Sequence, residues 1–121
     1  MASKPPVLII TGYGVNCEAE SRHAWQTAGA APRLVHLNDL LENPAQLTRF
    51  KALMFIGGFS FGDHMGSGEA LALRLRSRAE EKLVDFIRRG HLVLGVCNGF
   101  QVMVKLGLLP GLDGNYLRRS V

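Results

Sequence analysis

The stretch from Leu92 to Gln101 reads Leu-Val-Leu-Gly-Val-Cys-Asn-Gly-Phe-Gln. Its first half is apolar, as in a buried strand, and the residues after it have helical spacing. Glycines two residues before and after Cys97 permit a backbone turn that is too sharp for larger side chains. This pattern is typical of a nucleophile elbow, a strand-to-helix turn that exposes a reactive side chain above a sheet. Cys97 is therefore the first candidate catalytic residue.

The rest of the chain alternates between apolar runs and amphipathic stretches. The apolar runs predict four strands, at Pro6–Thr11, Arg33–Leu37, Ala52–Ile56 and His91–Val96. Helical spacing predicts three helices, at about Cys17–Ala28, at about Gly68–Arg89 and from the elbow to about Leu106. The apolar side of the second helix is expected to consist of Leu71, Leu75, Ala79, Leu83, Phe86 and Ile87.

Capping residues mark the expected ends of these helices. Asn16 is expected to cap the first helix at its N-terminus, and Gly29 and Gly90 are expected just past the first and second helices. Between the second and third strands we expect two short helical pieces, one over Leu40-Leu41 capped by Asn38-Asp39, and one opened by Pro44.

Nearly all-apolar strands that alternate with helices indicate a parallel sheet covered on both faces. The predicted fold is α/β, a doubly wound parallel sheet of the flavodoxin-like kind, with residues 1–121 as a single domain. Functional sites in this class lie beyond the carboxyl ends of the strands. Three strand ends carry suggestive residues, and we expect them to converge on one crevice: Gly12–Glu18, Gly57–Asp63 and Cys97–Gln101.

Composition narrows the classes of function. The chain has no uninterrupted run of eighteen apolar residues, so no membrane span is expected, and its start lacks the pattern of a signal peptide. We therefore expect a cytoplasmic protein with both cysteines, Cys17 and Cys97, in the reduced state. The formal net charge is +4, but no aromatic residues interleave the basic ones, and nucleic-acid binding is not expected. The arginines from Arg74 to Arg89 are typical of a solvated helix.

The loop Gly57-Gly58-Phe59-Ser60-Phe61-Gly62-Asp63 suggests an oxyanion hole. Backbone N–H groups near Gly58 and Phe59, with that of Asn98 after the cysteine, could donate to a developing negative charge. No Lys-Ser/Thr pair follows the loop, which excludes a Walker-type phosphate site, and no complete dinucleotide fingerprint follows the first strand. No metal site is predicted.

Three motifs together resemble a known family: Gly14–Glu18, Gly57–Asp63 and Gly95–Gln101. The chain resembles the amino-terminal part of class I glutamine amidotransferases, and among them the glutaminase subunits or domains of phosphoribosylformylglycinamidine synthases, which act in purine biosynthesis. The resemblance implies that Cys97 attacks the side-chain amide of glutamine, that Gly57 and Gln101 lie close to the substrate, and that a glutamyl thioester forms and is hydrolysed.

The resemblance also implies a partner protein, and the chain differs from the family in one respect. Ammonia would pass to a synthetase subunit or domain, which would hold ATP and magnesium, so no cofactor is expected in this chain. Family members carry a catalytic histidine and glutamate after the elbow, whereas this sequence ends at Val121 without them. None of its four histidines, at positions 23, 36, 64 and 91, stands in a matching motif. We expect a truncated chain that is inactive alone, from a parent with a separate glutaminase subunit, and that self-associates through an exposed sheet edge.

Two alternatives remain open from the residues. The wider superfamily of DJ-1 and PfpI-like proteins pairs an elbow cysteine with a glutamate after the first strand, where Glu18 stands. Glu18 is equally explained as a first-turn acid that favours a helix N-terminus. The other alternative is a noncatalytic flavodoxin-like interaction module, which would be preferred if Cys97 proved buried and inert to thiol reagents.

Overall fold

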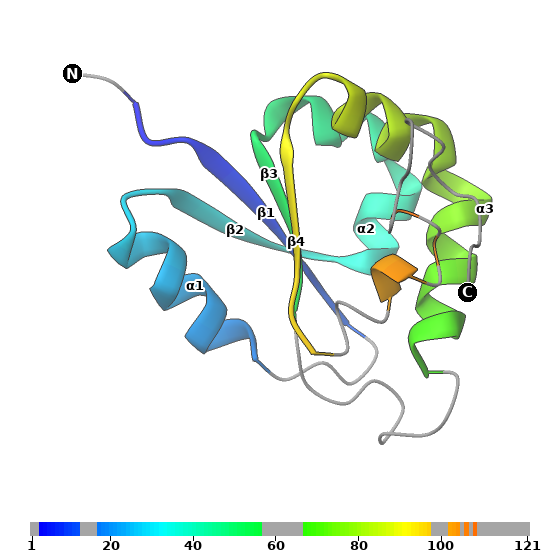
Figure 1. Cartoon of the computed structure of the whole chain (residues 1–121), viewed down its shortest axis with the longest axis horizontal. Coiled ribbons are helices and arrows are strands. Elements are labelled where there is room, and N and C mark those ends of the chain that lie inside the picture. Colours follow the sequence, from blue (N-terminus) through cyan, green and yellow to red (C-terminus); the bar gives the residue numbers. More distant parts are fainter. Residues whose placement is uncertain are drawn as a thin grey trace.

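Four apolar segments pair side by side into one parallel sheet in the order β2-β1-β3-β4. The computed structural model describes residues 3–12, 17–56, 67–97, 102–104, 106 and 108, and the side chains of residues 67–72 lie outside that description. The strands are β1 Pro6–Thr11, β2 Ala31–His36, β3 Ala52–Phe55 and β4 Leu92–Gly95 (Figure 1). Three α-helices and a 3-10 helix connect them: α1 Glu18–Thr27, α2 Leu37–Glu42, η1 Pro44–Arg49 and α3 Ser67–Arg88. The predicted parallel α/β fold is confirmed.

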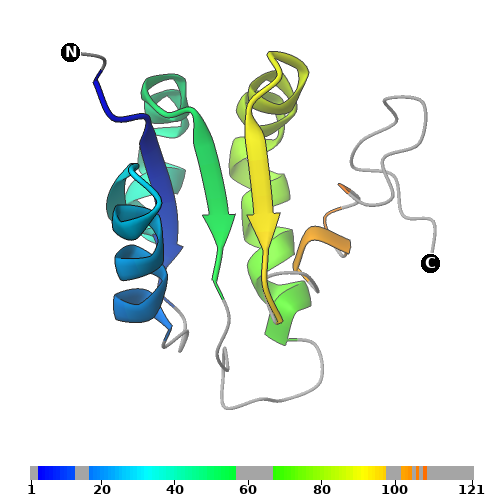
Figure 2. The same cartoon turned by 60° about the vertical axis from the view of Figure 1, so that its left-hand side comes forward.

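The alternation of side chains along the strands builds two separate cores, one on each face of the sheet. On one face Leu8, Leu53 and Phe55 pack beneath α2, η1 and α3, together with residues 102, 103, 106 and 108. On the other face Val7, Ile9 and Met54 pack beneath α1. Figure 2 shows α1 and α3 on opposite sides of the sheet. The predicted apolar side of α3 is confirmed at four residues that are fully buried, Leu75, Ala79, Leu83 and Phe86.

The α1 side of the sheet is covered unevenly. The indole N–H of Trp25 on α1 donates to the sulfur of Met54 on β3 at 3.0 Å, so α1 reaches as far as the second strand from the β4 edge. On β4, Leu92 and Leu94 are 68% and 44% exposed, and Val96, just after the strand, is 42% exposed. The expectation that both faces are covered is therefore wrong for β4 within the described residues, because α1 lies over the β1 half of the sheet.

The second strand begins two residues earlier than predicted. Ala31 pairs with Pro6, and Pro32 lies opposite Val7 in the same ladder. A proline is tolerated here because β2 is at the sheet edge, where the missing N–H removes no ladder bond. The strand also ends one residue early, since Leu37 is the first residue of α2. The cap of that helix is His36, whose Nδ1 accepts from the backbone N–H of Asn38 at 3.0 Å, and not the predicted Asn38-Asp39.

The predicted cap of α1 is wrong at the N-terminus and confirmed at the C-terminus. At the N-terminus, Cys17 occupies the cap position and makes no side-chain cap hydrogen bond, so the prediction of Asn16, which lies outside the described residues, is wrong. At the C-terminus, Gly29 has φ of +95° and the N–H of Ala30 donates to the carbonyl of Trp25. These are the contacts of a Schellman motif, and they confirm the predicted glycine stop. Gly90, with φ of +86°, likewise follows α3.

Position 12, directly after β1, requires a glycine because of its backbone conformation and because of a neighbouring side chain. Its φ is +112°, and a Cβ built there would lie 2.9 Å from Nε2 of His36. The imidazole cannot readily retreat, because its other nitrogen caps α2 through Asn38. One close approach thus connects the end of β1 to the start of α2.

We expect Gly12→Ala to lower the free energy of unfolding by about 2–3 kcal/mol, from backbone strain and the contact with His36. Gly29→Ala is the matched control, because its backbone is similarly strained while its Cβ would meet nothing within 4 Å; it should lower the free energy by about 1–2 kcal/mol. Denaturant unfolding measures both. In a His36→Ala background the two substitutions should become equal, and a Gly12 effect that stays unchanged there would contradict the proposed contact.

Candidate functional site

The carboxyl ends of β3 and β4 lie next to each other. The two strands are parallel, Phe55 is paired with Gly95, and the N–H of Val96 donates to the carbonyl of Phe55 at 3.2 Å. Cys97 follows this last bond by one residue, and Gly57 follows Phe55 by two. The chain therefore brings Ile56, the last described residue before the glycine-rich loop, to the same end of the sheet as the cysteine, and β1 ends on the other side of β3. The ends of β1, β3 and β4 lie side by side, whereas the crevice expected between the three loops stays a prediction, because most of the loop residues lie outside the described ones.

Cys97 has the backbone of a sharp turn. Its φ is +52°, the single positive value among the non-glycine residues that the structure describes. The left-handed conformation costs an L-residue about 1–2 kcal/mol. The side chain is exposed. A strained backbone that presents an exposed sulfur at the carboxyl edge of a parallel sheet fits the elbow expected from the sequence, and the exposure argues against a buried, inert cysteine.

The other predicted site residues lie outside the described residues. These are the oxyanion-hole candidates Gly58, Phe59 and Asn98 and the substrate-binding candidates Gly57 and Gln101. Their roles stay predictions. Glu18, which the rival superfamily would place beside the cysteine, is described and lies in the first turn of α1. That position agrees with its explanation as an acid at a helix N-terminus.

The three described histidines are distant from Cys97. His91 precedes β4, at the opposite end of the strand, where its ring packs on Phe86 with centroids 4.8 Å apart. His23 is exposed on α1. His36 does end a strand at the carboxyl edge, but β2 is three strands from β4, which is about 14 Å at the usual strand spacing. His64 lies outside the described residues.

The remaining expectations about the site concern redox state, metals and membranes. Neither cysteine forms a disulfide, as predicted. Within the described ranges, no three His, Cys, Asp or Glu side chains cluster in a way that could hold a metal ion. In the same ranges, no helix combines the length and hydropathy needed to cross a bilayer.

Sequence reasoning missed two contacts near this edge. His36 was treated as a residue without a role, yet it caps α2 and covers Gly12. Arg74 was placed on a solvated helix face, yet its Nη2 donates to Oδ1 of Asn38 on α2 at 3.3 Å. The cap from His36 to Asn38 is local, whereas the approach of His36 to Gly12 and the bond from Arg74 to Asn38 join residues that only the chain's path through the sheet brings together.

The known proteins that are similar to this chain belong to one kind, the glutamine amidotransferases. The model of the CobB/CobQ-like glutamine amidotransferase domain matches residues 4–121. The phosphoribosylformylglycinamidine synthase subunit PurQ of Methanococcus maripaludis is 49% identical over 111 residues, which are 90% of this chain and 41% of that protein. The protein of the same name from Dehalococcoides mccartyi is 43% identical, over 90% of this chain and 43% of its own length. The chain thus spans about two fifths of the length of these curated relatives.

A solved structure shows the same arrangement in space. One chain of the PurLQS structure from Thermotoga maritima superposes with a TM-score of 0.68 at 30% identity, covering 88% of this chain and 46% of that one. The fold and the motifs therefore agree with one family.

The backbone at position 97 can be tested without an activity assay. We expect Cys97→Gly to be more stable than Cys97→Ala by about 1 kcal/mol, because glycine adopts a left-handed φ without strain. The control is Leu94 in the regular strand β4, where glycine should be less stable than alanine by about 0.5–1 kcal/mol. Urea unfolding measures all four variants. The same order of stability at both positions would contradict the elbow backbone.

Proposed function

Because the chain belongs to the CobB/CobQ-like glutamine amidotransferase family, we propose that it is part of the glutaminase component of a phosphoribosylformylglycinamidine synthase. In this proposal Cys97 is the nucleophile that releases ammonia from glutamine for purine biosynthesis. The observation that carries the proposal is the exposed sulfur on a left-handed backbone beside the end of β3. The identity of 49% to a PurQ subunit supports the choice of synthase.

The proposed reaction proceeds through a covalent intermediate. The sulfur of Cys97 attacks the side-chain amide carbon of glutamine, and the carbonyl oxygen becomes an oxyanion that backbone N–H groups near Gly58, Phe59 and Asn98 stabilise. The C–N bond then breaks, ammonia leaves with an added proton, and a glutamyl thioester remains. Water attacks the thioester, glutamate departs and the thiol is restored. Gly57 and Gln101 hold the substrate in this scheme.

Proton transfer needs a group that the described residues do not supply near Cys97. An acid must protonate the departing ammonia and a base must activate water. Of the three described histidines, His23 lies on α1 and His36 ends β2, which is three strands from β4. His91 precedes β4, at the end of the sheet opposite Cys97. We therefore expect the 121-residue chain by itself to release little ammonia, and we assign the acid and base roles to none of the described residues.

In this proposal the glutaminase chain and the synthetase bind different substrates. A synthetase subunit or domain receives the ammonia and binds ATP and magnesium, and this chain binds glutamine alone. The cytoplasmic location expected from the sequence belongs to the same proposal. The relatives support a subunit arrangement, since they are named as one subunit of the synthase and the superposed chain comes from a PurLQS structure.

A glutamine-like alkylating agent tests the nucleophile separately from turnover. A diazoketone analogue of glutamine should modify Cys97 stoichiometrically in the folded chain, as detected by mass spectrometry of its peptides. Free glutamine should protect the residue, and Cys97→Ser should remove the adduct while Cys17→Ser should leave it unchanged.

Two outcomes would contradict the assignment. Alkylation without protection by glutamine would show an exposed thiol but no glutamine site. Selective conversion of Cys97 to sulfinic acid by mild peroxide, with no reaction toward the analogue, would instead favour the DJ-1 and PfpI-like alternative. Rapid ammonia release by the chain alone, abolished in Cys97→Ala, would contradict the expected inactivity while supporting the nucleophile.

We propose in addition that isolated chains associate through β4. This strand is at the sheet edge, and its residues Leu92 and Leu94 expose 68% and 44% of their surface. An edge strand with exposed apolar side chains favours pairing with another chain.

Sedimentation equilibrium tests the association. The unmodified chain should show a mass that rises with concentration, and Leu94→Lys should sediment as a monomer, because a lysine on an edge strand opposes pairing. Leu73→Lys is the matched control, since Leu73 is a leucine of 61% exposure on α3, away from the edge. An unmodified chain that remains monomeric at all concentrations would refute the association.

A further inference from the structure

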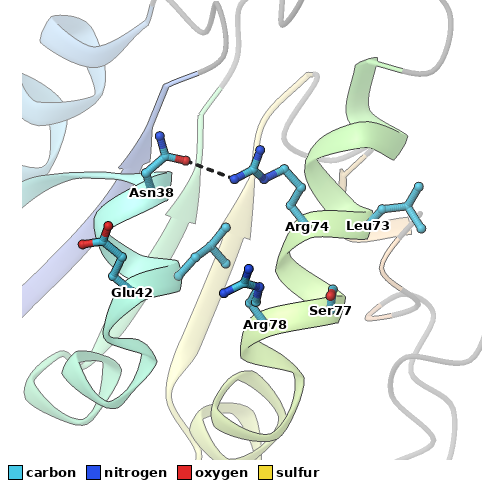
Figure 3. A pocket seen from close by; sticks show the side chains of 7 residues that line it. Asn38, Glu42, Leu73, Arg74, Ser77 and Arg78 are labelled. Atoms are coloured by element: carbon cyan, nitrogen blue, oxygen red, sulfur yellow. Dashed lines mark hydrogen bonds between the residues drawn. The ribbon is translucent and has the colours of Figure 1, made fainter.

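Asn38, the second residue of α2, takes part in two hydrogen bonds that lead to different parts of the chain. Its backbone N–H donates to Nδ1 of His36 at 3.0 Å, and its side-chain Oδ1 accepts from Nη2 of Arg74 on α3 at 3.3 Å. Figure 3 shows the side chain of Asn38 pointing from α2 toward the guanidinium group of Arg74. One residue therefore connects the end of β2 with α3.

The first bond holds the ring of His36 against the end of β1. His36 pairs with Thr11 in the ladder between β2 and β1, and its Nε2 lies 2.9 Å from the place where a Cβ of Gly12 would be. The ring cannot rotate away from Gly12 without the loss of the cap that its Nδ1 gives to α2. The start of α2 thus restrains the point at which the chain leaves β1.

The second bond holds the start of α3. Arg74 is in the second turn of this helix, which begins at Ser67, directly after the segment 57–66 that contains the predicted oxyanion-hole residues. A guanidinium group has five N–H donors, so it can bond to Asn38 and to other groups at the same time. The bond limits the movement of α3 relative to α2. The helix that follows the glycine-rich segment is therefore restrained by the same residue as the end of β1.

Both restraints act at the end of the sheet that carries Cys97. α2 and α3 each follow a strand of a parallel sheet, so both helices begin at its carboxyl end. Cys97 itself follows β4, which is held by its ladder with β3. The two bonds of Asn38 therefore act on the segments beside the cysteine, and not on the backbone of the cysteine.

We propose that Asn38 is a positioning residue for the glutaminase reaction. It holds the end of β1 and the start of α3 in a fixed relation, so that the segments attached to them keep the geometry that glutamine and its oxyanion require. Oxyanion stabilisation depends on donors that are in place before the reaction, and small misplacements of reacting groups slow it strongly. Asn38 acts through His36 and Arg74 and touches no reacting atom. The inference rests on the proposed function for the identity of the reaction.

Two alkylating reagents test the positioning role. The diazoketone analogue of glutamine needs both the glutamine site and the thiol, whereas iodoacetamide needs the thiol alone. Asn38→Ala removes the bond to Arg74 and keeps the backbone N–H that His36 accepts. It should slow alkylation of Cys97 by the analogue about threefold to tenfold, and raise the glutamine concentration for half-protection by a similar factor, as expected for one lost hydrogen bond. Its rate with iodoacetamide should stay within about twofold.

Two further variants serve as controls. Asn38→Asp keeps an oxygen that accepts from Arg74, so its rate with the analogue should stay within about twofold of that of the unmodified chain. Gln46→Ala is the matched control. The side chain of Gln46 on η1 donates to the carbonyl of Asp39 on α2 at 3.0 Å, an exposed bond to the same helix that involves neither β1 nor α3. Its loss should leave both alkylation rates unchanged.

Amide hydrogen exchange, followed by NMR, measures the restraint on α3 independently of the reaction. In Asn38→Ala the amides of residues 71–74, in the second turn of α3, should exchange about threefold to tenfold faster than in the unmodified chain. The amides of the buried strand β3 should exchange as before, and Gln46→Ala should change neither set.

The outcomes separate the positioning role from the proposed function. Equal slowing of both reagents in Asn38→Ala would indicate a general change in the fold and overturn the positioning role. An unchanged rate with the analogue, in a chain whose adduct glutamine prevents, would overturn the positioning role and leave the proposed function in place. Faster exchange in α3 without any glutamine-protected adduct in the unmodified chain would overturn the proposed function, and the positioning role with it. Slow alkylation in Asn38→Asp would refute the role of the oxygen that accepts from Arg74.

Discussion

The parallel pairing of β3 with β4 is the constraint on which the candidate site depends. The ladder ends with the bond from the N–H of Val96 to the carbonyl of Phe55. Because both strands run in the same direction, Ile56, the last described residue before the glycine-rich loop, and the turn at Cys97 follow the two strands at the same end of the sheet. An antiparallel partner would place these two segments at opposite edges. The chemistry proposed for Cys97 therefore follows from strand direction as much as from the presence of a thiol.

The same sheet is stabilised unequally along its width. The central strands β1 and β3 are buried on both faces, and β1 is held by β2 on one side and β3 on the other. On β4, Val93 packs against the core beneath α3, whereas Leu92 and Leu94 on the other face are exposed. The strand that leads to the cysteine is thus anchored from one side. Burial of its second face would add stabilisation of roughly 25 cal/mol for each Å² of apolar surface removed from water.

Two residues with positive φ, Cys97 and Gly12, lie at the carboxyl end of the sheet. Cys97 adopts a left-handed backbone that glycine would adopt with less strain, so the chain retains a thiol there at a cost in stability. Gly12 has no side chain because His36 occupies the space where a Cβ would be. Strained conformations concentrate where structure serves a site, and this edge follows that tendency. The opposite edge has turns such as Gly29 and Gly90, whose Cβ positions face open space.

Most of the fold could be predicted from local patterns in the sequence. Apolar runs located all four strands, helical periodicity identified the buried side of α3, and the glycine stops after α1 and α3 were correct, because each depends on neighbouring residues alone. The elbow proposed at Cys97 was also visible in the sequence, since its glycines and its place after a strand are local features. What only the tertiary structure decided depends on residues far apart in sequence. The strand order placed Pro32 at an edge and let β2 begin earlier, and it brought His36 over Gly12. The tertiary structure also joined Arg74 to Asn38 and left one face of β4 exposed. A local pattern predicts which residues are buried and which form a turn. It does not predict which distant segment of the chain packs beside them.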